Sequence, residues 1–527
     1  MDNVRAGQVN AARPGTILRW SVALAILLAY VAVPDAWPDM TAFNADDSEA
    51  YLSLAYALGH GLGYTRSLIP GQYLPHTTWP PGLPLLLAPL MAVLHLPLDW
   101  LVVKEAMILL GLCGIVLTWL YVRRIAGQRG AADAAAVLIA LNPFYWHFSR
   151  MVLSEVPSFV FAIGCLLLID LVWRDRAVKP WEAGLTGLVC GLGMLLRGNV
   201  LGLALVPLAY VLRRQPPTQV SRVPASRQRM AWLLHFVLFC VAFVVWAARN
   251  RAIDTSQLGS DGINQMRMLL AADPFDAHSA LRGPLAIAHG FWDNLIHRDI
   301  YNVPEQILPG FYLLDWRHWP FAAGPAVLFT LAIGVVALSV GAVGAPLLLV
   351  IVPWVALLSL LAFGGSARYW VPITSMVTLL LVIRLWPMAA RLAPRLSAIG
   401  ATVVAAAFVF NLAVYVQRNQ LHPYMADFGD MIALFEQVRD RPEKPAAMLT
   451  EHQGIYTFIT GAAAPLNAPA AGLAPHYTHL ICRIASTPYA STIDPPSGTA
   501  VQLQVGAWRL YALPRPMTVQ EIETGHG

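Results

Sequence analysis

Long apolar stretches alternate with short polar segments over most of the chain. An apolar run of about 18 residues is typical of a membrane-crossing helix, because lipid offers no partners to backbone polar groups. The pattern therefore predicts an all-α polytopic membrane protein of about eleven spans, of which 131–141 and 181–196 fit this criterion least well. The predicted spans cover residues 17–35, 100–122, 131–141, 155–173, 181–196, 199–212, 231–248, 321–341, 345–363, 371–388 and 397–416.

The polar segments are longest at 36–99, 249–320 and 417–527. The first contains an amphipathic helical stretch, 48–58, followed by glycines, and then an apolar stretch that opens at Trp79. Prolines inside that second stretch favour a helix lying in the membrane interface over a spanning helix.

The last segment has the pattern of a small α/β domain. Residues 430–438 are predicted to be helical, and residues 446–450, 480–484 and 501–513 are predicted to be strands, the last of them at an edge. The chain thus divides into a transmembrane domain, 1–416, and a C-terminal domain, 417–527.

Composition supports the membrane assignment. Hydrophobic residues make up 57% of the 527 positions and charged residues only 12%, about half the charged fraction of a soluble protein. The net charge of +5 does not indicate nucleic-acid binding, because the basic residues occupy short loops between apolar runs. Four of the five cysteines lie inside apolar runs, so no disulfide framework is expected.

The distribution of lysine and arginine predicts the orientation. With the N-terminus inside, the basic loops at 123–129, 174–179, 213–229 and 384–395 all fall on the cytoplasmic side. The long segments and the C-terminal domain then face outward. For a bacterial inner membrane, that side is the periplasm.

Four motifs resemble those of the C-type membrane glycosyltransferases, and most closely the bacterial branch of protein O-mannosyltransferases and lipid A aminoarabinose transferases. The motifs, all predicted on the outer face, are Asp47-x-x-x-Tyr51-x-x-x-Ala55, Pro80-Pro81-Gly82-Leu83-Pro84, Leu153-Ser154-Glu155-Val156-Pro157 and Ala367-Arg368-Tyr369-x-x-Pro372. The order and topology match over about residues 15–416. The resemblance implies transfer of a sugar from a polyprenyl-phosphate donor, undecaprenyl phosphate being the carrier, to a glycan, lipid or protein acceptor.

One position departs from the family. Aminoarabinose transferases place a lysine that contacts the lipid phosphate directly before the Pro-Pro pair, where this chain has Trp79. The phosphate contact is therefore expected from another residue. Tyr51, Trp79 and Tyr369 lie within or beside the motifs and are expected to contact substrate.

Such a transfer needs one carboxylate base for the acceptor hydroxyl and cations for the departing phosphate. Asp47 is the preferred base. Neighbouring residues on a helix point about 100° apart, so Asp46 is the alternative rather than a second base. Both carboxylates could instead simply cap the helix that follows.

The other candidates are charged residues at the ends of apolar runs. Glu155 could orient the acceptor, bind a metal or pair with Arg150. Arg197 and Arg368 are expected to hold the donor phosphate, with snorkelling to the interface as the alternative. Arg66 and His76 are weaker phosphate candidates, since loops tolerate solvated charge. No cofactor is predicted with certainty and no His-x-x-x-His spacing is present, so a divalent metal stays open.

Three other functions compete with this interpretation. A transporter or flippase of a lipid-linked glycan would place ionisable groups near the bilayer midplane, whereas here they gather at the predicted outer surface. An O-antigen ligase or polymerase would carry its catalytic loop later in the chain. An assembly factor with a degenerate site would not need the acidic and Arg-Tyr motifs intact.

Overall fold

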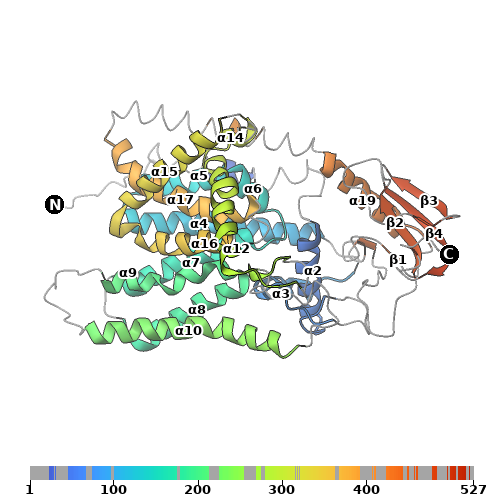
Figure 1. Cartoon of the computed structure of the whole chain (residues 1–527), viewed down its shortest axis with the longest axis horizontal. Coiled ribbons are helices and arrows are strands. Elements are labelled where there is room, and N and C mark those ends of the chain that lie inside the picture. Colours follow the sequence, from blue (N-terminus) through green and yellow to red (C-terminus); the bar gives the residue numbers. More distant parts are fainter. Residues whose placement is uncertain are drawn as a thin grey trace, which may run out of the picture.

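Apolar helices packed side by side form the larger part of the molecule, and a small sheet with one helix lies at one end of it (Figure 1). The computed structural model describes residues 23–28, 30, 45–66, 74–96, 100–174, 178–212, 225–253, 269–273, 279–314, 316, 319, 321–361, 367–391, 406, 409–410, 413, 423–442, 448–449, 456, 459–460, 477–483, 495–496, 499–505, 508–517 and 522.

Within these residues, four helices are long and apolar enough to cross a membrane. They are α4 (Trp100–Ala126), α7 (Glu155–Trp173), α10 (Ala225–Arg251) and α17 (Ala367–Ala389). Shorter helices stand among them: α5 (Arg129–Ala140), α6 (Pro143–Phe148), α8 (Pro180–Leu196), the 3₁₀ helix η3 (Gly198–Ala204) with α9 (Val206–Leu212), α15 (Ala323–Ser339) and α16 (Ala345–Ser359).

Each predicted span from 100–122 to 371–388 thus coincides with a helix, or with a 3₁₀ helix continued by an α-helix. Of the span at 17–35, only residues 23–28 and 30 are described, and they are helical. The span at 397–416 lies almost wholly outside the described residues.

Glycines let α8 and α10 touch backbone to backbone. A Cβ atom on Gly187 would lie 2.2 Å from the carbonyl oxygen of His235, and one on Gly191 would lie 2.2 Å from that of Phe239. Small residues four apart are the usual means by which membrane helices approach this closely, because lipid gives no hydrophobic drive for association. The Gly187-x-x-x-Gly191 spacing therefore fixes this helix pair.

Two short helices lie against the end of the bundle that faces the sheet: α2 (Ala45–Gly59) and α3 (Gly82–Met91) (Figure 1). They match the two helices predicted in the polar segment 36–99. The end of α2 contacts α3 closely, since a Cβ on Gly59 would lie 2.7 Å from the Ala88 carbonyl oxygen. After α2 the chain turns through Gly61 and Gly63, which have φ values of 73° and 78°, a region that glycine enters without strain.

Within the polar segment 249–320, residues 284–313 form short consecutive helices. They are α12 (Pro284–Asp293), the π-helix η5 (Asn294–Asp299), α13 (Ile300–Ile307) and α14 (Gly310–Leu313). Of these, α13 packs against both α15 and α17.

The C-terminal part consists of α19 (Pro423–Arg439) and four strands, β1 (Met448–Leu449), β2 (Tyr477–Arg483), β3 (Ala500–Val505) and β4 (Trp508–Met517). The strand order is β1-β2-β4-β3; β1 and β2 are parallel, and the other pairs are antiparallel. The prediction of a single strand at 501–513 is wrong. That stretch holds two antiparallel strands. In the sequence, Gly506 interrupts the apolar alternation, and a glycine within an alternating pattern is typical of a break between strands.

Two main groups of buried apolar side chains hold these parts together. The larger lies among the bundle helices. The second includes Tyr51 and Leu52 of α2, Leu83 of α3, Phe435 of α19 and Leu510 of β4. The second cluster therefore joins α2 and α3 to the C-terminal part.

Candidate active site

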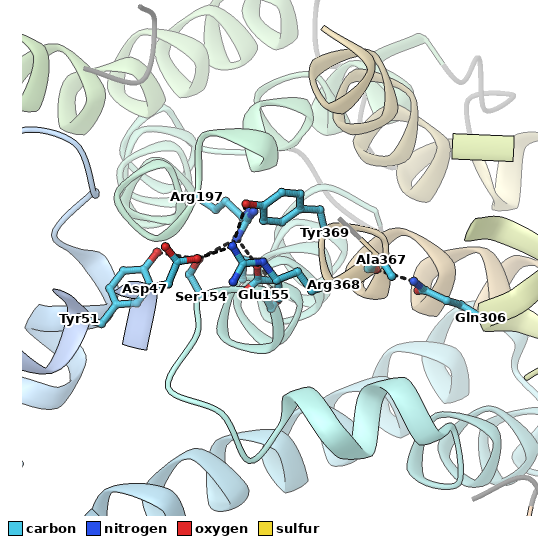
Figure 2. Close-up of polar contacts among 10 residues, drawn as sticks. Asp47, Tyr51, Ser154, Glu155, Arg197, Gln306, Ala367, Arg368 and Tyr369 are labelled. Atoms are coloured by element: carbon cyan, nitrogen blue, oxygen red, sulfur yellow. Dashed lines mark hydrogen bonds and ion pairs between the residues drawn. The ribbon is translucent and has the colours of Figure 1, made fainter. Parts of the chain in front are cut away.

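Asp47 lies in the first turn of α2, where a carboxylate is stabilised by the positive end of the helix dipole. Its side chain is 19% exposed and forms an ion pair with Arg368, at the start of α17 (Figure 2). Asp46 is in the same turn, but its side chain is outside the described residues. The structure thus brings the first and last of the four sequence motifs into contact.

Glu155 is the first residue of α7 and is almost fully buried, with 2% of its side chain exposed. Its Oε1 atom lies 3.0 Å from Nη1 of Arg197 and 3.5 Å from Nε of Arg368. The pairing of Glu155 with Arg150, one of the sequence alternatives, is not what the structure has. The Arg150 guanidinium instead stacks over the Trp146 ring at 3.5 Å from its centre.

Arg197 follows the last residue of α8 in extended backbone conformation, with φ −162° and ψ 129°. Besides pairing with Glu155, its Nη1 donates to Ser154 Oγ at 2.8 Å. The Tyr51 hydroxyl donates to the same oxygen at 3.1 Å. Ser154 was not among the predicted site residues, although it joins α2, α7 and the end of α8.

The close approach of α3 to the end of α8 also positions the backbone that carries Arg197. A Cβ on Gly82 would lie 2.5 Å from the backbone atoms of Leu195 and Leu196, so only glycine fits between α3 and the end of α8. This contact gives the Pro80-Pro81-Gly82 motif a structural role beside the site.

Tyr369 lies between the two arginines (Figure 2). Its ring centre is 4.6 Å from the guanidinium carbon of Arg197 and 4.8 Å from that of Arg368, and its hydroxyl accepts a hydrogen bond from Arg368 Nη2 at 2.9 Å. The electron-rich ring stabilises both cations. The result is a compact group of two carboxylates, two guanidiniums and an aromatic ring from four separate elements.

The surroundings shift the pKa values of two α2 side chains, Asp47 and Tyr51. Burial raises the pKa of Asp47 above its ordinary value, the charge of Glu155 adds to that rise, and Arg368 opposes it. Burial likewise raises the pKa of Tyr51, so its hydroxyl stays neutral and able to donate. A carboxylate with a raised pKa is a stronger base than a solvated aspartate.

Two buried polar atoms in this group lack a hydrogen-bond partner among the described residues: Arg368 Nη1 and Glu155 Oε2. Leaving such groups unpaired is costly, and they are uncommon outside functional sites. An anionic ligand could accept from the first, and a hydroxyl could donate to the second.

The remaining candidates occupy the loop between α2 and α3. Arg66 Nη2 lies 3.8 Å from Glu49 Oε1. His76 is buried; its Nε2 accepts from the Trp79 amide at 2.9 Å, and its carbonyl accepts from Arg249 Nη1. Trp79 is half-buried, with its ring 5.9 Å from that of Tyr51. Phosphate contacts for Arg66 and His76, and a substrate contact for Trp79, stay predictions.

No group of three or more histidine, cysteine or acidic side chains that could hold a metal ion is found in the described part of the chain.

Known proteins resemble this chain in sequence and in fold. Residues 79–247, which include Glu155 and Arg197, match the family of dolichyl-phosphate-mannose-protein mannosyltransferases. ArnT from Cupriavidus metallidurans, crystallised with undecaprenyl phosphate, has a similar structure with a TM-score of 0.53 and 15% sequence identity, over 95% of this chain and 98% of that one. The chain has a C-type glycosyltransferase fold.

Further structures agree with this fold. Apo ArnT from the same organism gives a TM-score of 0.54 at 13% identity, over 97% of this chain and 99% of that one. The Archaeoglobus fulgidus oligosaccharyltransferase, solved with zinc and sulfate, gives 0.50 at 13% identity, over 88% and 68%. No curated protein sequence matches the chain at a significant level. The family match and the fold confirm the predicted resemblance to the C-type enzymes and the predicted class, a glycosyltransferase.

Proposed function

We propose that the chain transfers a sugar from a polyprenyl-phosphate donor to a hydroxyl-bearing acceptor at the periplasmic face of the bacterial inner membrane. The observation that carries this proposal is the convergence of Asp47 with two partly buried arginines, Arg197 and Arg368, from distant parts of the chain. The transfer chemistry requires a base beside two cations, and the site supplies them.

In the proposed reaction the acceptor oxygen attacks the anomeric carbon while the bond from that carbon to the donor phosphate breaks. The acceptor proton passes to Asp47, whose raised pKa suits it to this task. The polyprenyl phosphate leaves as an anion, so it needs positive charge rather than an acid. The Nη1 atom of Arg368, which has no partner among the described residues, is available for that anion.

A single displacement of this kind inverts the configuration at the sugar carbon. NMR of the product tests this directly, since an inverting enzyme gives the anomer opposite to that of the donor. Retention would require a covalent or internal-return intermediate, which the proposed roles do not include.

The orientation is proposed from charge. The basic segment 213–229, which follows α9 and extends into α10, holds five arginines, more than any other predicted cytoplasmic loop. The start of α10 lies at the end of the bundle opposite to α2, α3 and the C-terminal sheet (Figure 1). The site and the residues after about 417 would then face the periplasm.

The decisive experiment uses the purified full chain in lipid nanodiscs with a panel of radiolabelled undecaprenyl-phosphate sugars. We expect wild-type protein to release or transfer the label and Asp47→Asn to lose about 100-fold or more of that rate, the usual contribution of a general base. Asp133→Asn, which removes a carboxylate that bonds to Trp119 away from the site, serves as the control.

Two outcomes would contradict the proposal in different ways. If wild-type protein consumes no donor across the panel, the transfer function is wrong and transport of a lipid-linked glycan becomes the leading alternative. If Asp47→Asn is as active as wild type, the transfer function stands and the base is another carboxylate, Asp46 or Glu155.

A further inference from the structure

One buried side chain from the polar segment 249–320 contacts the backbone at the start of α17. Gln306 of α13 is 1% exposed, and its Nε2 donates to the carbonyl oxygen of Ala367, the residue immediately before Arg368 (Figure 2). Its Oε1 accepts from Thr374 Oγ1 at 2.8 Å. A carbonyl can only accept, so the Ala367 oxygen settles which end of the amide faces it.

Gln306 also contacts the segment that precedes Glu155. The backbone carbonyl of Gln306 accepts a hydrogen bond from Nδ2 of Asn142 at 2.6 Å. Asn142 in turn caps α6 through its Oδ1, which accepts from the amides of Phe144 and Tyr145 at 3.0 and 3.1 Å. The short α6 leads directly into the segment that carries Ser154 and Glu155. Gln306 thus connects the backbone beside Arg368 with the helix that precedes Glu155.

A second buried contact from the same segment supports α17 one turn further on. Asp299 is fully buried, accepts from Trp370 Nε1 at 3.1 Å and accepts from Ser359 Oγ of α16 at 2.9 Å. With this anchor in place, loss of the Gln306 contacts would loosen the first turn of α17 without releasing the whole helix.

We propose that Gln306 is a positioning residue for transfer, acting through Arg368, and this inference rests on the function proposed above. In the proposed reaction Arg368 pairs with Asp47 and Glu155 and also binds the departing phosphate. The position of its guanidinium therefore has to be held within about 0.5 Å. Gln306 fixes the backbone from which the Arg368 side chain extends. It contacts no reacting atom.

The test compares Gln306→Met, which keeps the length of the side chain and removes both hydrogen bonds, with Thr378→Val as the matched control. Thr378 is buried on α17, and within the described residues its hydroxyl donates only to the Thr374 carbonyl of that helix. Because Arg368 would act on charge that develops in the transition state, we expect kcat of Gln306→Met to fall about tenfold or more. The KM for the lipid donor should change much less, and Thr378→Val should keep both values.

Gln306→Glu provides a second variant of the same shape. In its ionised form the carboxylate would repel the Ala367 carbonyl, so kcat measured at alkaline pH should fall at least as far as in Gln306→Met. Wild-type kcat in either folded variant would overturn the proposal, as would a fall in kcat that Thr378→Val shares.

A structure of Gln306→Met determined by cryo-electron microscopy tests the positioning without any donor. We expect the Arg368 guanidinium to leave Asp47 and Glu155; finding it in place would overturn the inference. If wild-type protein proves inactive on every donor but Arg368 is displaced in the variant, the positioning role stands and the proposed transfer function fails.

Discussion

Asp47 and Arg368 are 321 positions apart in the chain and form an ion pair in the folded protein. Both belong to the group of two carboxylates and two guanidiniums, whose side chains are at most 19% exposed. Each arginine faces a carboxylate, and Glu155 faces both arginines. Removing one member would leave an uncompensated charge in a partly buried place, which is usually costly.

The acidity of Asp47 gives a prediction at this scale. Burial raises its pKa, so its base form is lost on acidification at a higher pH than the ordinary value of about 3.9 for a free aspartate. The donor is a phosphodiester and keeps a single charge in this range. We therefore expect kcat/KM to decline below a pKa that lies above that value, measured over a pH series in nanodiscs.

Arg368 provides the comparison for this pH profile. Its charge lowers the pKa of Asp47, so Arg368→Gln should move the acidic limb to higher pH in addition to lowering the rate. An acidic limb that stays where it is in this variant would mean that another group titrates.

The sequence singled out the four charged residues of the candidate site but did not indicate how they pair. Charged groups at the ends of apolar runs are conspicuous because they are expensive in a membrane. Pairing depends on how α2, α7, α8 and α17 come together, and no local pattern records that. Ser154 gave no signal of its own, since a serine before a helix predicts a cap. In the structure its hydroxyl instead accepts from Arg197 and Tyr51.

At the scale of elements, the site depends on how closely α3 approaches α8. Only glycine fits at position 82, and the contact lies beside the turn that carries Arg197. We expect Gly82→Ala to move α3 or that turn and to lower the transfer rate about tenfold or more, because small misplacements near a reacting centre are costly. The rate is measured with the same donor assay.

Gly164→Ala is the control for this prediction. A Cβ there would meet only Leu117 Cδ1 at 3.6 Å, which is ordinary contact, and position 164 lies within the spanning helix α7. Equal rates for both variants and wild type would show that the α3–α8 contact does not position the site.

Elements were predicted well where periodicity or length was unambiguous and less well elsewhere. The bundle helices followed from apolar run length. The error at 501–513 arose because two short strands joined by two residues have almost the same alternation as one long strand. Nothing in the sequence indicated the Gln306 contacts either, because a glutamine in a polar segment is ordinarily expected to be solvated.

At the scale of the whole molecule, the second apolar cluster joins the C-terminal part to the helix that carries Asp47. Phe435 of α19 is fully buried there, with its ring 5.2 Å from that of Tyr456. We expect Phe435→Ala to destabilise the C-terminal part by about 3–5 kcal/mol. We also expect it to lower transfer, because α2 loses part of its support.

Thermal unfolding and the donor assay check this prediction together, with Gln437→Ala, on the exposed side of the same helix, as the control. A Phe435→Ala protein whose C-terminal part is destabilised but whose transfer rate is normal would separate that part from the site.

The backbone contact between α8 and α10 has a consequence for evolution. Gly187 and Gly191 leave no room for a side chain, whereas Leu188 and Leu192 on the same helix are 38% and 46% exposed and can be exchanged for other apolar residues. Over long divergence the leucines should drift and the two glycines should persist. Distant relatives could then be recognised by a pair of glycines four apart, a few residues before the arginine that follows the helix.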